Sequence, residues 1–472
     1  MNRTEMTNPE IASSPGSRSA ERLDRSHRQR ELQRRVIQLA PILQGLDARR
    51  RELSRRFRRG AHIIDFFHQV DDAYSHLALQ AIGPLLDRYQ VEFRFHLTSQ
   101  TDRAHAPEPA MLATYARRDC AAVAPHYGLE FPAEASCPSK ADVAKVEGML
   151  AGLVSRSTLP ANSESDFLKV ARAAGQALWN SDGETLDRLA THSSMASPQE
   201  TADVIAAGNK LRSQKRHYSG GMFWYAGQWY WGVDRLYHLE NRLIELGAER
   251  THQNEICFKR PPLDPGKIQN EGRLTLEFFP SLRSPYTAMI FDRSLALAAS
   301  VAIPVRLRPV MPMVMRGVPA PGAKGLYIML DALREAEAIG APFGNMYDPI
   351  GTAVERGYAI WAAARDQERG DAFLSSFLRS AFVEGRPSGS IKDLRRIAEE
   401  SGLCFEEVRA GLENDGWRDE LEHNRLAMYQ ELGVWGVPSY RLQEKGQPDL
   451  CVWGQDRLWL IADEIRRRLA NV

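Results

Sequence analysis

The chain has 472 residues, of which 43% are hydrophobic and 26% are charged, as expected for a globular protein of roughly two or three domains. This composition excludes a disordered or a fibrous protein. The 61 basic and 60 acidic residues nearly cancel, so the overall charge makes nucleic acid an unlikely partner. The charge is nevertheless segregated, because residues 1–60 hold fifteen Arg, no Lys and seven acidic residues. Their net charge is +8, and the rest of the chain carries −7.

Residues 1–60 are expected to form a disordered start of nineteen residues followed by an Arg-rich amphipathic arm. In the arm, Pro41 is expected to interrupt or kink the helix. The arm could contact phosphates or an anionic membrane surface, and the favoured alternative is a solvated helix that lies on the acidic body. Its apolar residues at helical spacing are Leu32, Val36, Leu39, Leu43 and Leu46.

Several kinds of site and segment have no support in the sequence. The start of the chain has no apolar core of signal-peptide type, and no run of 18 uncharged apolar residues occurs, so we expect a cytoplasmic protein without a membrane span. The cysteines form no CxxC pair, which excludes a redox dithiol or a zinc ribbon, and the twelve histidines show no ligand spacing, so no metal site is expected. The cysteines are Cys120, Cys137, Cys257, Cys404 and Cys451.

The chain contains an internal repeat. The segment WGVDRL at 231–236 returns as WGQDRL at 453–458, and residues 62–79 align without a gap on residues 274–291. Two matches in the same order predict two copies of one unit of about 200 residues. We place the copies at 61–250 and 273–472, joined by the polar, Pro-rich linker 251–272.

Each copy shows the order strand, helix, strand, long helical stretch, hairpin and final helix. This is the order of a thioredoxin fold with a helical insertion, so we predict an α/β protein with two thioredoxin-like domains behind the Arg-rich helical arm. The strands expected in the first copy are 62–67 and 91–97, and its hairpin is 222–231 with the turn at 226–227. The second copy has strands at 274–279 and 305–311, and its hairpin is 439–453 with a longer loop around Gly446.

In the second copy, Ser284 and Pro285 follow the first strand, where the chain turns into a helix. Ser is a favoured N-cap and Pro a favoured first helical residue, so a plain helix start is one interpretation. Alternatively, the helix N-terminus and the hydroxyl could stabilise the thiolate of a bound ligand and lower its pKa.

Two further segments of the second copy could contact a ligand. Pro438 stands at the start of the hairpin, where it marks either a simple loop or a cis bond that leaves the backbone of Val437 able to pair with a peptide-like ligand. Gln455, Asp456 and Arg457 precede the last helix. Asp and Arg there could bind the zwitterionic end of an amino acid, or could cap the helix and pair with neighbours.

The segments EFFPSLRSPYT, GVWGVPSY and VWGQDRL together resemble the 2-hydroxychromene-2-carboxylate isomerases and kappa-class glutathione transferases, which are relatives of DsbA-type oxidoreductases. The resemblance covers nearly all of residues 273–472. It implies that Ser284, followed by Pro285, holds the sulfur of glutathione, and that Val437 with Pro438 binds its cysteinyl backbone.

The resemblance further implies that Gln455 and Asp456, next to Arg457, hold the γ-glutamyl end of glutathione. The family also has an Asn shortly before an AK--Y motif. Here Ala323-Lys324 and Tyr327 supply that motif, with Lys324 as a glutathione-binding residue, but no Asn stands nearby. One glutathione contact of the family therefore has no counterpart.

The first copy differs more from the family pattern than the second copy does. Asp72 stands at the position of Ser284, Ala73 at that of Pro285 and Gly221 at about that of Pro438. An ionised Asp accepts hydrogen bonds and would raise the pKa of a neighbouring thiol, so this copy is not expected to activate glutathione. Another site remains possible in this copy. Asp71 and Asp72, with His68 nearby, could form an acid/base or cation-binding cluster, or could be an ordinary polar helix cap. Asp234 and Arg235 are the other residues of this possible site.

The first copy also has six aromatic residues in nine, at 223–231. These rings could stack single-stranded bases, but alternation along a hairpin places about half of them in the core, and core or interface packing is the favoured interpretation.

The leading hypothesis is a glutathione-dependent isomerase or transferase that acts on a small conjugated or aromatic-derived electrophile, with glutathione as co-substrate and no metal. A non-catalytic thioredoxin-fold binding protein is the alternative. A DsbA-family thiol-disulfide oxidoreductase is the third choice, because no cysteine stands at position 284 or its counterpart. The resemblance also implies pairing, either as an internal pseudo-dimer of the two copies or as a homodimer.

Overall fold

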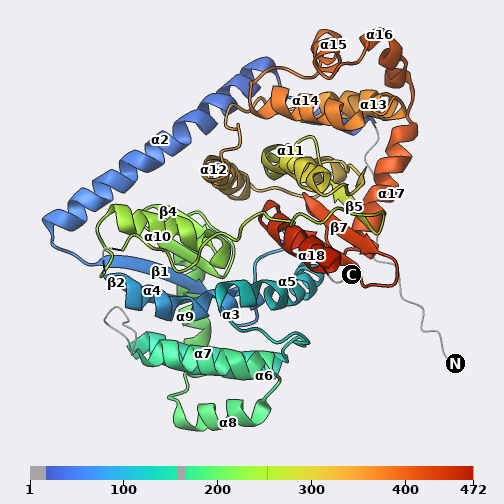
Figure 1. Ribbon diagram of the computed structural model, residues 1–472. Coiled ribbons are helices and arrows are strands. Elements are labelled where there is room, and N and C mark those ends of the chain that lie inside the picture. The colour runs from blue at the N-terminus through green and yellow to red at the C-terminus, as the bar shows by residue number, and fades with distance from the viewer. Residues whose placement is uncertain (1–16, 157–164, 252, 471–472) are drawn as a thin grey trace. The chain divides into compact units, whose positions relative to one another are not determined.

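The computed structural model describes residues 17–156, 165–251 and 253–470 (Figure 1). The chain divides into two compact units, one made of Ala40–Pro262 and the other of the residues up to Leu39 together with those from Leu263 onward. Among the described residues, no helix is long and apolar enough to cross a membrane.

The Ala40–Pro262 unit contains a four-stranded sheet in the order β2-β1-β3-β4. The first pair is parallel and the other two are antiparallel. A parallel pair needs a crossover connection, which α3 and α4 provide, and β1 is buried because helices and neighbouring strands cover it. The elements of this part are β1 (His62–His68), α3 (Ala73–Gln80), α4 (Ile82–Arg88), β2 (Val91–Leu97), β3 (Met222–Tyr225) and β4 (Gln228–Trp231).

The long connection between β2 and β3 is helical, as the sequence predicts. Its helices begin at recognisable caps, for example the capping box of Ser197 and Glu200 at the start of α9. The elements are α5 (Pro109–Val123), η1 (Ala124–Tyr127), α6 (Lys140–Arg156), α7 (Asp166–Trp179), α8 (Gly183–His192) and α9 (Pro198–Gln214); η2 (Val233–Arg235) and α10 (Leu236–Glu245) follow the hairpin.

The second unit contains a sheet of the same pattern, in the order β6-β5-β7-β8, again with one parallel pair followed by two antiparallel pairs. β5 spans Leu274–Phe279 and β6 spans Val305–Leu307. The predicted strand 305–311 is therefore too long. It ends two residues before Pro309, because proline has no N–H to donate to the ladder.

The remaining elements of this unit cover its sheet or form its helical insertion. They are α11 (Pro285–Ser300), η3 (Met313–Arg316), α12 (Gly322–Ala338), α13 (Thr352–Asp366), α14 (Gly370–Phe382), α15 (Ile391–Glu400), α16 (Phe405–Val408), η4 (Arg409–Glu413), α17 (Gly416–Gln430), β7 (Ser439–Glu444), β8 (Leu450–Trp453), η5 (Gln455–Arg457) and α18 (Leu458–Ala470).

The two units resemble each other in a set of internal side-chain hydrogen bonds as well as in strand order. In each unit, one buried Asp of the helical insertion accepts hydrogen bonds from two tyrosines, at 2.8 and 3.1 Å in one and at 2.8 and 3.5 Å in the other. The equivalent sets are Tyr74, Tyr115 and Asp119, and Tyr286, Tyr327 and Asp331. Their sequence spacing is identical, so the resemblance extends from the sheets into the insertions.

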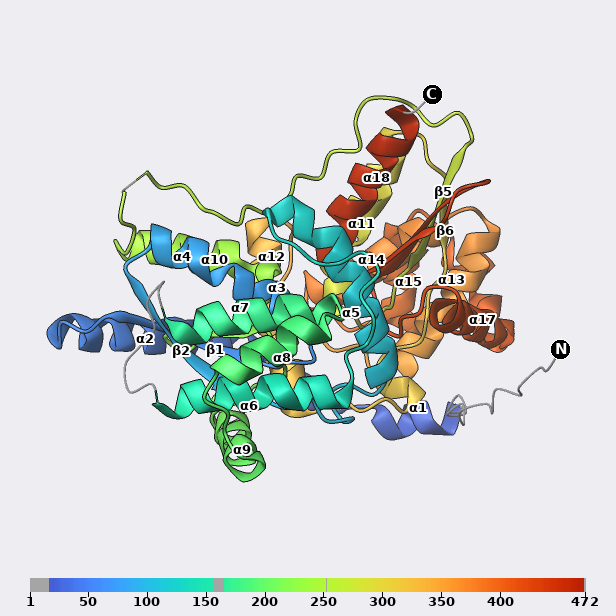
Figure 2. The ribbon, with the colours of Figure 1, turned by 90° about the horizontal axis from the view of Figure 1, so that it is seen from below.

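The Arg-rich arm forms α1 (Ser17–Leu23) and α2 (His27–Phe57). The prediction of a disordered start is wrong for residues 17–19, which begin α1, and residues 1–16 lie outside the described part. Of the two outcomes predicted for Pro41, interruption of the helix is wrong, because α2 continues through it (Figures 1 and 2). A proline inside a helix costs about 3 kcal/mol. Ile37 and Ala48, which lie on either side of Pro41, are buried.

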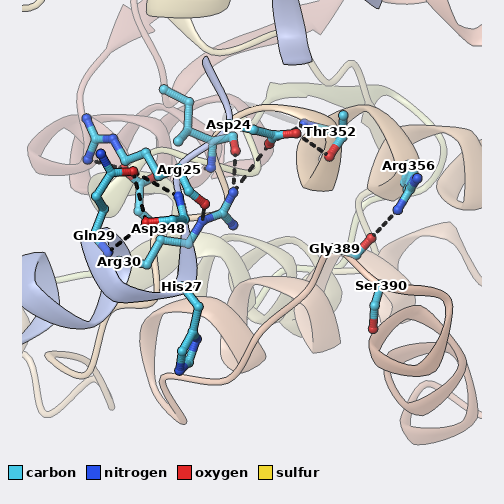
Figure 3. A network of polar contacts seen from close by, with 12 residues as sticks. Asp24, Arg25, His27, Gln29, Arg30, Asp348, Thr352, Arg356, Gly389 and Ser390 are labelled. Atoms are coloured by element: carbon cyan, nitrogen blue, oxygen red, sulfur yellow. Dashed lines mark hydrogen bonds and ion pairs between the residues drawn. The ribbon is translucent and has the colours of Figure 1, made fainter. Parts of the chain in front are cut away.

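The start of the arm is held by polar contacts in the unit that contains α13 (Figure 3). Asp24 accepts hydrogen bonds from the N–H and the hydroxyl of Thr352, at 3.0 and 2.9 Å. The residue before α13 is Gly351, which has no side chain for capping, so Asp24 caps this helix from a distant part of the sequence. Arg30 donates to the Ile350 carbonyl at 3.1 Å and pairs with Asp24.

Candidate functional site

Ser284 is the N-cap of α11, and its hydroxyl oxygen accepts a hydrogen bond from the N–H of Thr287 at 3.1 Å. Pro285 occupies the first helical position, as the sequence predicts. The side chain of Ser284 is half-buried, and its Oγ lies 3.5 Å from the carbonyl oxygen of Val437. The fold thus brings together two predicted site residues that are 153 positions apart.

The loop before Ser284 is fixed from two sides. The N–H of Leu282 donates to the hydroxyl of Tyr358 at 3.1 Å, and that hydroxyl donates to the carbonyl of Val310 at 2.8 Å. Arg283 donates to both carboxylate oxygens of buried Asp348. Burial by itself would raise the pKa of Asp348, but the charge and hydrogen bonds of Arg283 hold that pKa below its ordinary value. The turn before Ser284 is therefore held by hydrogen bonds from two sides.

The Val437–Pro438 peptide bond is cis. The carbonyl of Pro438 accepts a hydrogen bond from the N–H of Gly454 at 2.9 Å, which ties the segment before α18 to this loop. Gly454 has a φ of +117°, and a Cβ there would lie 2.4 Å from Oδ1 of Asp456. Only glycine allows the half-buried Asp456 carboxylate to fold back over this turn.

The side chains on either side of Asp456 point into the protein. Gln455 is buried and donates from Nε2 to the buried carboxylate of Glu335, on α12, at 2.7 Å. Arg457 is buried and donates from Nη1 to the backbone carbonyl of Asp456 at 3.0 Å. Both side chains hold the turn in place, and Asp456 is the more exposed of the three.

Lys324 lies in the first turn of α12, and its burial lowers the pKa of its amine. Among the described residues, the Ser284 hydroxyl contacts Thr287 and Val437 but not Lys324. The link between the two helices is Tyr286, in the first turn of α11, which donates to Asp331 on α12 at 2.8 Å. Lys324 is thus on a helix that packs against α11.

Arg316 was not predicted from the sequence. It is 7% exposed, lies at the end of η3 and donates from Nη2 to the carbonyl of Trp435, two residues before Val437, at 3.0 Å. Within the described ranges, its Nε and Nη1 have no hydrogen-bond partner. A buried guanidinium with free N–H groups suits an anionic ligand. No local pattern marks Arg316, because its surroundings come from the loop before Pro438.

In the first unit, Asp72 caps α3, as predicted by the alternative that it is an ordinary helix cap. Its carboxylate accepts hydrogen bonds from the N–H groups of Tyr74 and Ser75, at 3.3 and 2.9 Å. Burial raises the pKa of Asp72 to about 6, against the effect of the Ser75 hydrogen bonds. A carboxylate therefore occupies the position at which Ser284 presents a hydroxyl in the other unit.

The counterpart of Pro438 is Gly221, as predicted. Its carbonyl accepts from the N–H of Gly232 at 2.9 Å, matching the contact between Pro438 and Gly454. Gly221 has a φ of +63°, which proline cannot adopt, and a Cβ there would lie 3.1 Å from the backbone N of Ser75. The backbone in this unit thus closes directly onto the start of α3.

The possible first-copy cluster is not joined by hydrogen bonds. Asp71 accepts from Gln69 at 2.9 Å, and neither Asp71 nor Asp72 is hydrogen-bonded to His68. Burial lowers the pKa of His68 to about 3. Over the described ranges, no group of three or more His, Cys, Asp or Glu side chains is placed to hold a metal ion.

The remaining predicted residues of this copy lie in η2. Arg235 is buried and Asp234 is half-buried, and Nη1 of Arg235 donates to the carbonyl of Asp234 at 3.4 Å. This is the counterpart of the contact between Arg457 and Asp456. In both turns, the Arg side chain therefore donates a hydrogen bond to the backbone carbonyl of the preceding Asp.

The aromatic hairpin of the first unit serves mainly as core. Four of its six rings are buried, which confirms the favoured interpretation for Phe223, Tyr225, Trp229 and Tyr230. Trp224 is half-buried, and the amine of Lys215 lies 3.0 Å from its ring centre.

Residues 275–466 match the family model described as DSBA-like thioredoxin domain. The C-terminal half of the chain therefore contains a DsbA-like thioredoxin domain. No curated protein matches the chain.

The chain also resembles several solved structures. A 2-hydroxychromene-2-carboxylate isomerase is 17% identical, with a TM-score of 0.35, over 41% of this chain and 95% of that one. The cytosolic disulfide reductase DsbM from Pseudomonas aeruginosa, in a structure with GSH, is 24% identical, with a TM-score of 0.33, over 42% and 97%. A probable DsbA oxidoreductase from Streptomyces coelicolor is 20% identical, with a TM-score of 0.34, over 42% and 91%.

Proposed function

We propose that the C-terminal thioredoxin-like domain binds glutathione and uses its thiolate in an isomerisation or transfer reaction. The observation that carries the proposal is the position of the Ser284 hydroxyl, at the N-terminus of α11 and 3.5 Å from the backbone of Val437. A tripeptide thiol bound along Val437 would place its sulfur near this hydroxyl.

The hydroxyl is suited to stabilise a thiolate. Ser284 Oγ already accepts the N–H of Thr287, and its own proton points to the Val437 carbonyl over 3.5 Å, which is a weak hydrogen bond. A thiolate can therefore take this proton as a hydrogen bond at little cost. The positive end of the α11 dipole acts in the same direction, so the pKa of the bound thiol falls.

Charged groups of the same domain suit the charges of glutathione, which has two carboxylates and one ammonium group. The carboxylate of Asp456 suits the ammonium of the γ-glutamyl end, and Arg457 and Gln455 keep its turn in place. Lys324 and the free N–H groups of Arg316 suit carboxylates of glutathione or of an acidic substrate.

In the proposed reaction, the thiolate adds to an electrophilic carbon of a conjugated, aromatic-derived compound and forms a C–S bond. Rotation about the bond that has lost its double-bond character, followed by expulsion of the thiolate, gives the isomer and regenerates glutathione. If a proton is taken up instead, the conjugate is the product.

For the first domain we propose a non-catalytic role, after a tandem duplication that produced domains at 61–250 and 273–472. The matching sheet orders and the matching Tyr–Asp–Tyr sets support the duplication. The carboxylate of Asp72 and the close approach of Gly221 to α3 support the loss of a thiol site. The two domains could form an internal pseudo-dimer.

Disulfide exchange is the less favoured activity. The residues that cap α3 and α11 are Asp72 and Ser284, and neither can form a disulfide. Thiol chemistry at this position therefore needs a bound thiol. Turnover of insulin reduction above background would contradict this argument.

Titration calorimetry with glutathione tests the proposal. The full chain is expected to bind, and Ser284→Ala is expected to weaken binding at least tenfold. Ser390→Ala is the matched control, because the hydroxyl oxygen of Ser390 accepts the N–H of Asp393 at the start of α15, as that of Ser284 accepts the N–H of Thr287. Absence of binding by the unmodified chain, or equal loss in both variants, would overturn the proposal.

A further inference from the structure

Helix α2 carries a stripe of large apolar side chains that the protein leaves exposed. Their exposed fractions run from 52% to 91%. Single exposed apolar residues are common, but a continuous row on one helix indicates an interaction surface. The leucine stripe, as we name it, consists of Leu32, Val36, Leu39, Leu43, Leu46, Leu53 and Phe57.

The spacing of the leucine stripe is that of a coiled coil. Its positions advance in alternating steps of four and three residues, and the pattern is complete if Arg50 is counted. Leucine stands at every seventh position, at 32, 39, 46 and 53. A repeat of 3.5 residues sustained over about four heptads is typical of a helix that pairs with another helix, and Leu at these positions is typical of coiled-coil dimers.

The opposite face of α2 is already used by the chain. Ile37 and Ala48 are buried, and Arg30 is 8% exposed. Gln44 and Asp47 face Gly227, and Arg51 lies over the ring of Trp224. The face opposite the leucine stripe is therefore covered in part by the chain, whereas the leucine stripe is exposed along its whole length.

We propose that the leucine stripe binds the same stripe of a second copy of this chain, so that two α2 helices form a two-stranded coiled coil. The stripe spans about 40 Å of helix, and a regular 3.5-residue repeat matches best a helix with the same repeat. A standard interface takes about 800 Å² from each partner, and seven side chains of this size, all more than half exposed, offer an area of that order.

Arg50 is the one charged residue in this pattern, and its side chain is 80% exposed. A single polar residue in a coiled-coil seam lowers affinity and fixes the register of the pair. Its long side chain can carry the charge out of the seam to water. The dimer is therefore expected to be reversible and to tighten when this charge is removed.

A membrane surface fits the leucine stripe less well. Helices that lie on membranes bury a broad apolar face and expose the opposite face to water. On the opposite face of α2, Arg30, Ile37 and Ala48 are buried. Charged Arg35, Arg49 and Arg56 line one edge of the stripe, together with exposed Ile42.

Sedimentation equilibrium of the full chain tests the proposal. The unmodified chain is expected to be a dimer that dissociates on dilution, and Leu39→Glu with Leu46→Glu is expected to be a folded monomer by circular dichroism. Ile268→Glu is the matched control, because Ile268 is 51% exposed and lies outside α2, and it should not change the mass.

Arg50→Leu should lower the dissociation constant at least tenfold, which gives a test that does not depend on a disruptive variant. A monomer at all concentrations, or a dimer that survives both Glu substitutions, would overturn the proposal. Monomers that float with phosphatidylserine vesicles, and lose this with the Glu substitutions, would assign the leucine stripe to membranes instead.

Discussion

Arg283 and Asp348 form a bidentate ion pair beside the N-terminus of α11, with Nε and Nη2 at 2.7 and 2.8 Å from the two carboxylate oxygens. Asp348 also pairs with Arg25, at 3.2 Å, and accepts the N–H of Ile350 at 3.1 Å. One buried carboxylate therefore fixes both the residue before Ser284 and the start of the arm. This pair is the main support of the candidate site.

Replacing Asp348 by Asn is expected to destabilise the protein by about 3 kcal/mol, because it leaves Arg283 buried without a counter-charge. Glutathione binding should weaken as well, since the turn before Ser284 loosens. Urea unfolding and calorimetry measure the two effects. In the control, Asp366→Asn breaks an exposed pair with Arg365 and should cost less than about 1 kcal/mol.

The ion pair of Arg283 and Asp348 makes the stability of the protein depend on pH. The folded-state pKa of Asp348 is below its ordinary value, so its contribution to stability is present above pH 4 or so and is lost as the pH falls through the folded pKa. Unfolding free energies measured between pH 3 and pH 7 should fall less steeply toward acid in Asp348→Asn than in the unmodified chain. Equal slopes would contradict the assignment.

Asp72 is expected to have the opposite pH dependence. Its folded pKa is raised to about 6, so its contribution is fully present below its ordinary pKa of about 4 and is lost as the pH rises through 6. Asp72→Asn should therefore stabilise the chain at pH 8 relative to pH 5, by on the order of 1 kcal/mol. Asp182→Asn is the control, because that exposed N-cap has a lowered pKa and its loss should not stabilise.

Ser284→Asp should abolish glutathione binding more completely than Ser284→Ala does. The added carboxylate would repel the thiolate and raise the pKa of the thiol, as Asp72 is placed to do in the first domain. Thiolate absorbance followed against pH measures that pKa in the bound state. A thiol pKa in the unmodified complex as high as in free glutathione would contradict the proposed role of Ser284.

Arg316→Met is expected to separate binding from stability. Removing a buried guanidinium with unpaired N–H groups should leave the unfolding free energy equal or higher, whereas affinity for an anionic ligand should fall about tenfold or more. Arg365→Met, at an exposed pair, is the control and should change neither quantity much. A loss of stability with unchanged affinity would show that Arg316 is purely structural.

The sequence determined the local structure and its repetition. The strand 274–279, the helix start at Ser284 and the hairpin turn at 226–227 lie where they were expected, because alternation, capping and turn residues act over a few positions. The period of the leucine stripe is also a property of the sequence. That the stripe remains exposed is a property of the fold.

Only the tertiary structure decided what surrounds Ser284. The contacts of Ser284 with Val437, of Arg283 with Asp348 and of Arg316 with Trp435 join residues 153, 65 and 119 positions apart. No local pattern encodes such pairs, since they depend on how the cis-proline loop and the helical insertion close around α11. The same holds for Asp24, which caps a helix 328 positions away because the helix begins at a glycine. Buried polar groups form hydrogen bonds and ion pairs with the groups that the fold brings near. The sequence could therefore suggest candidate residues, but not the contacts between them.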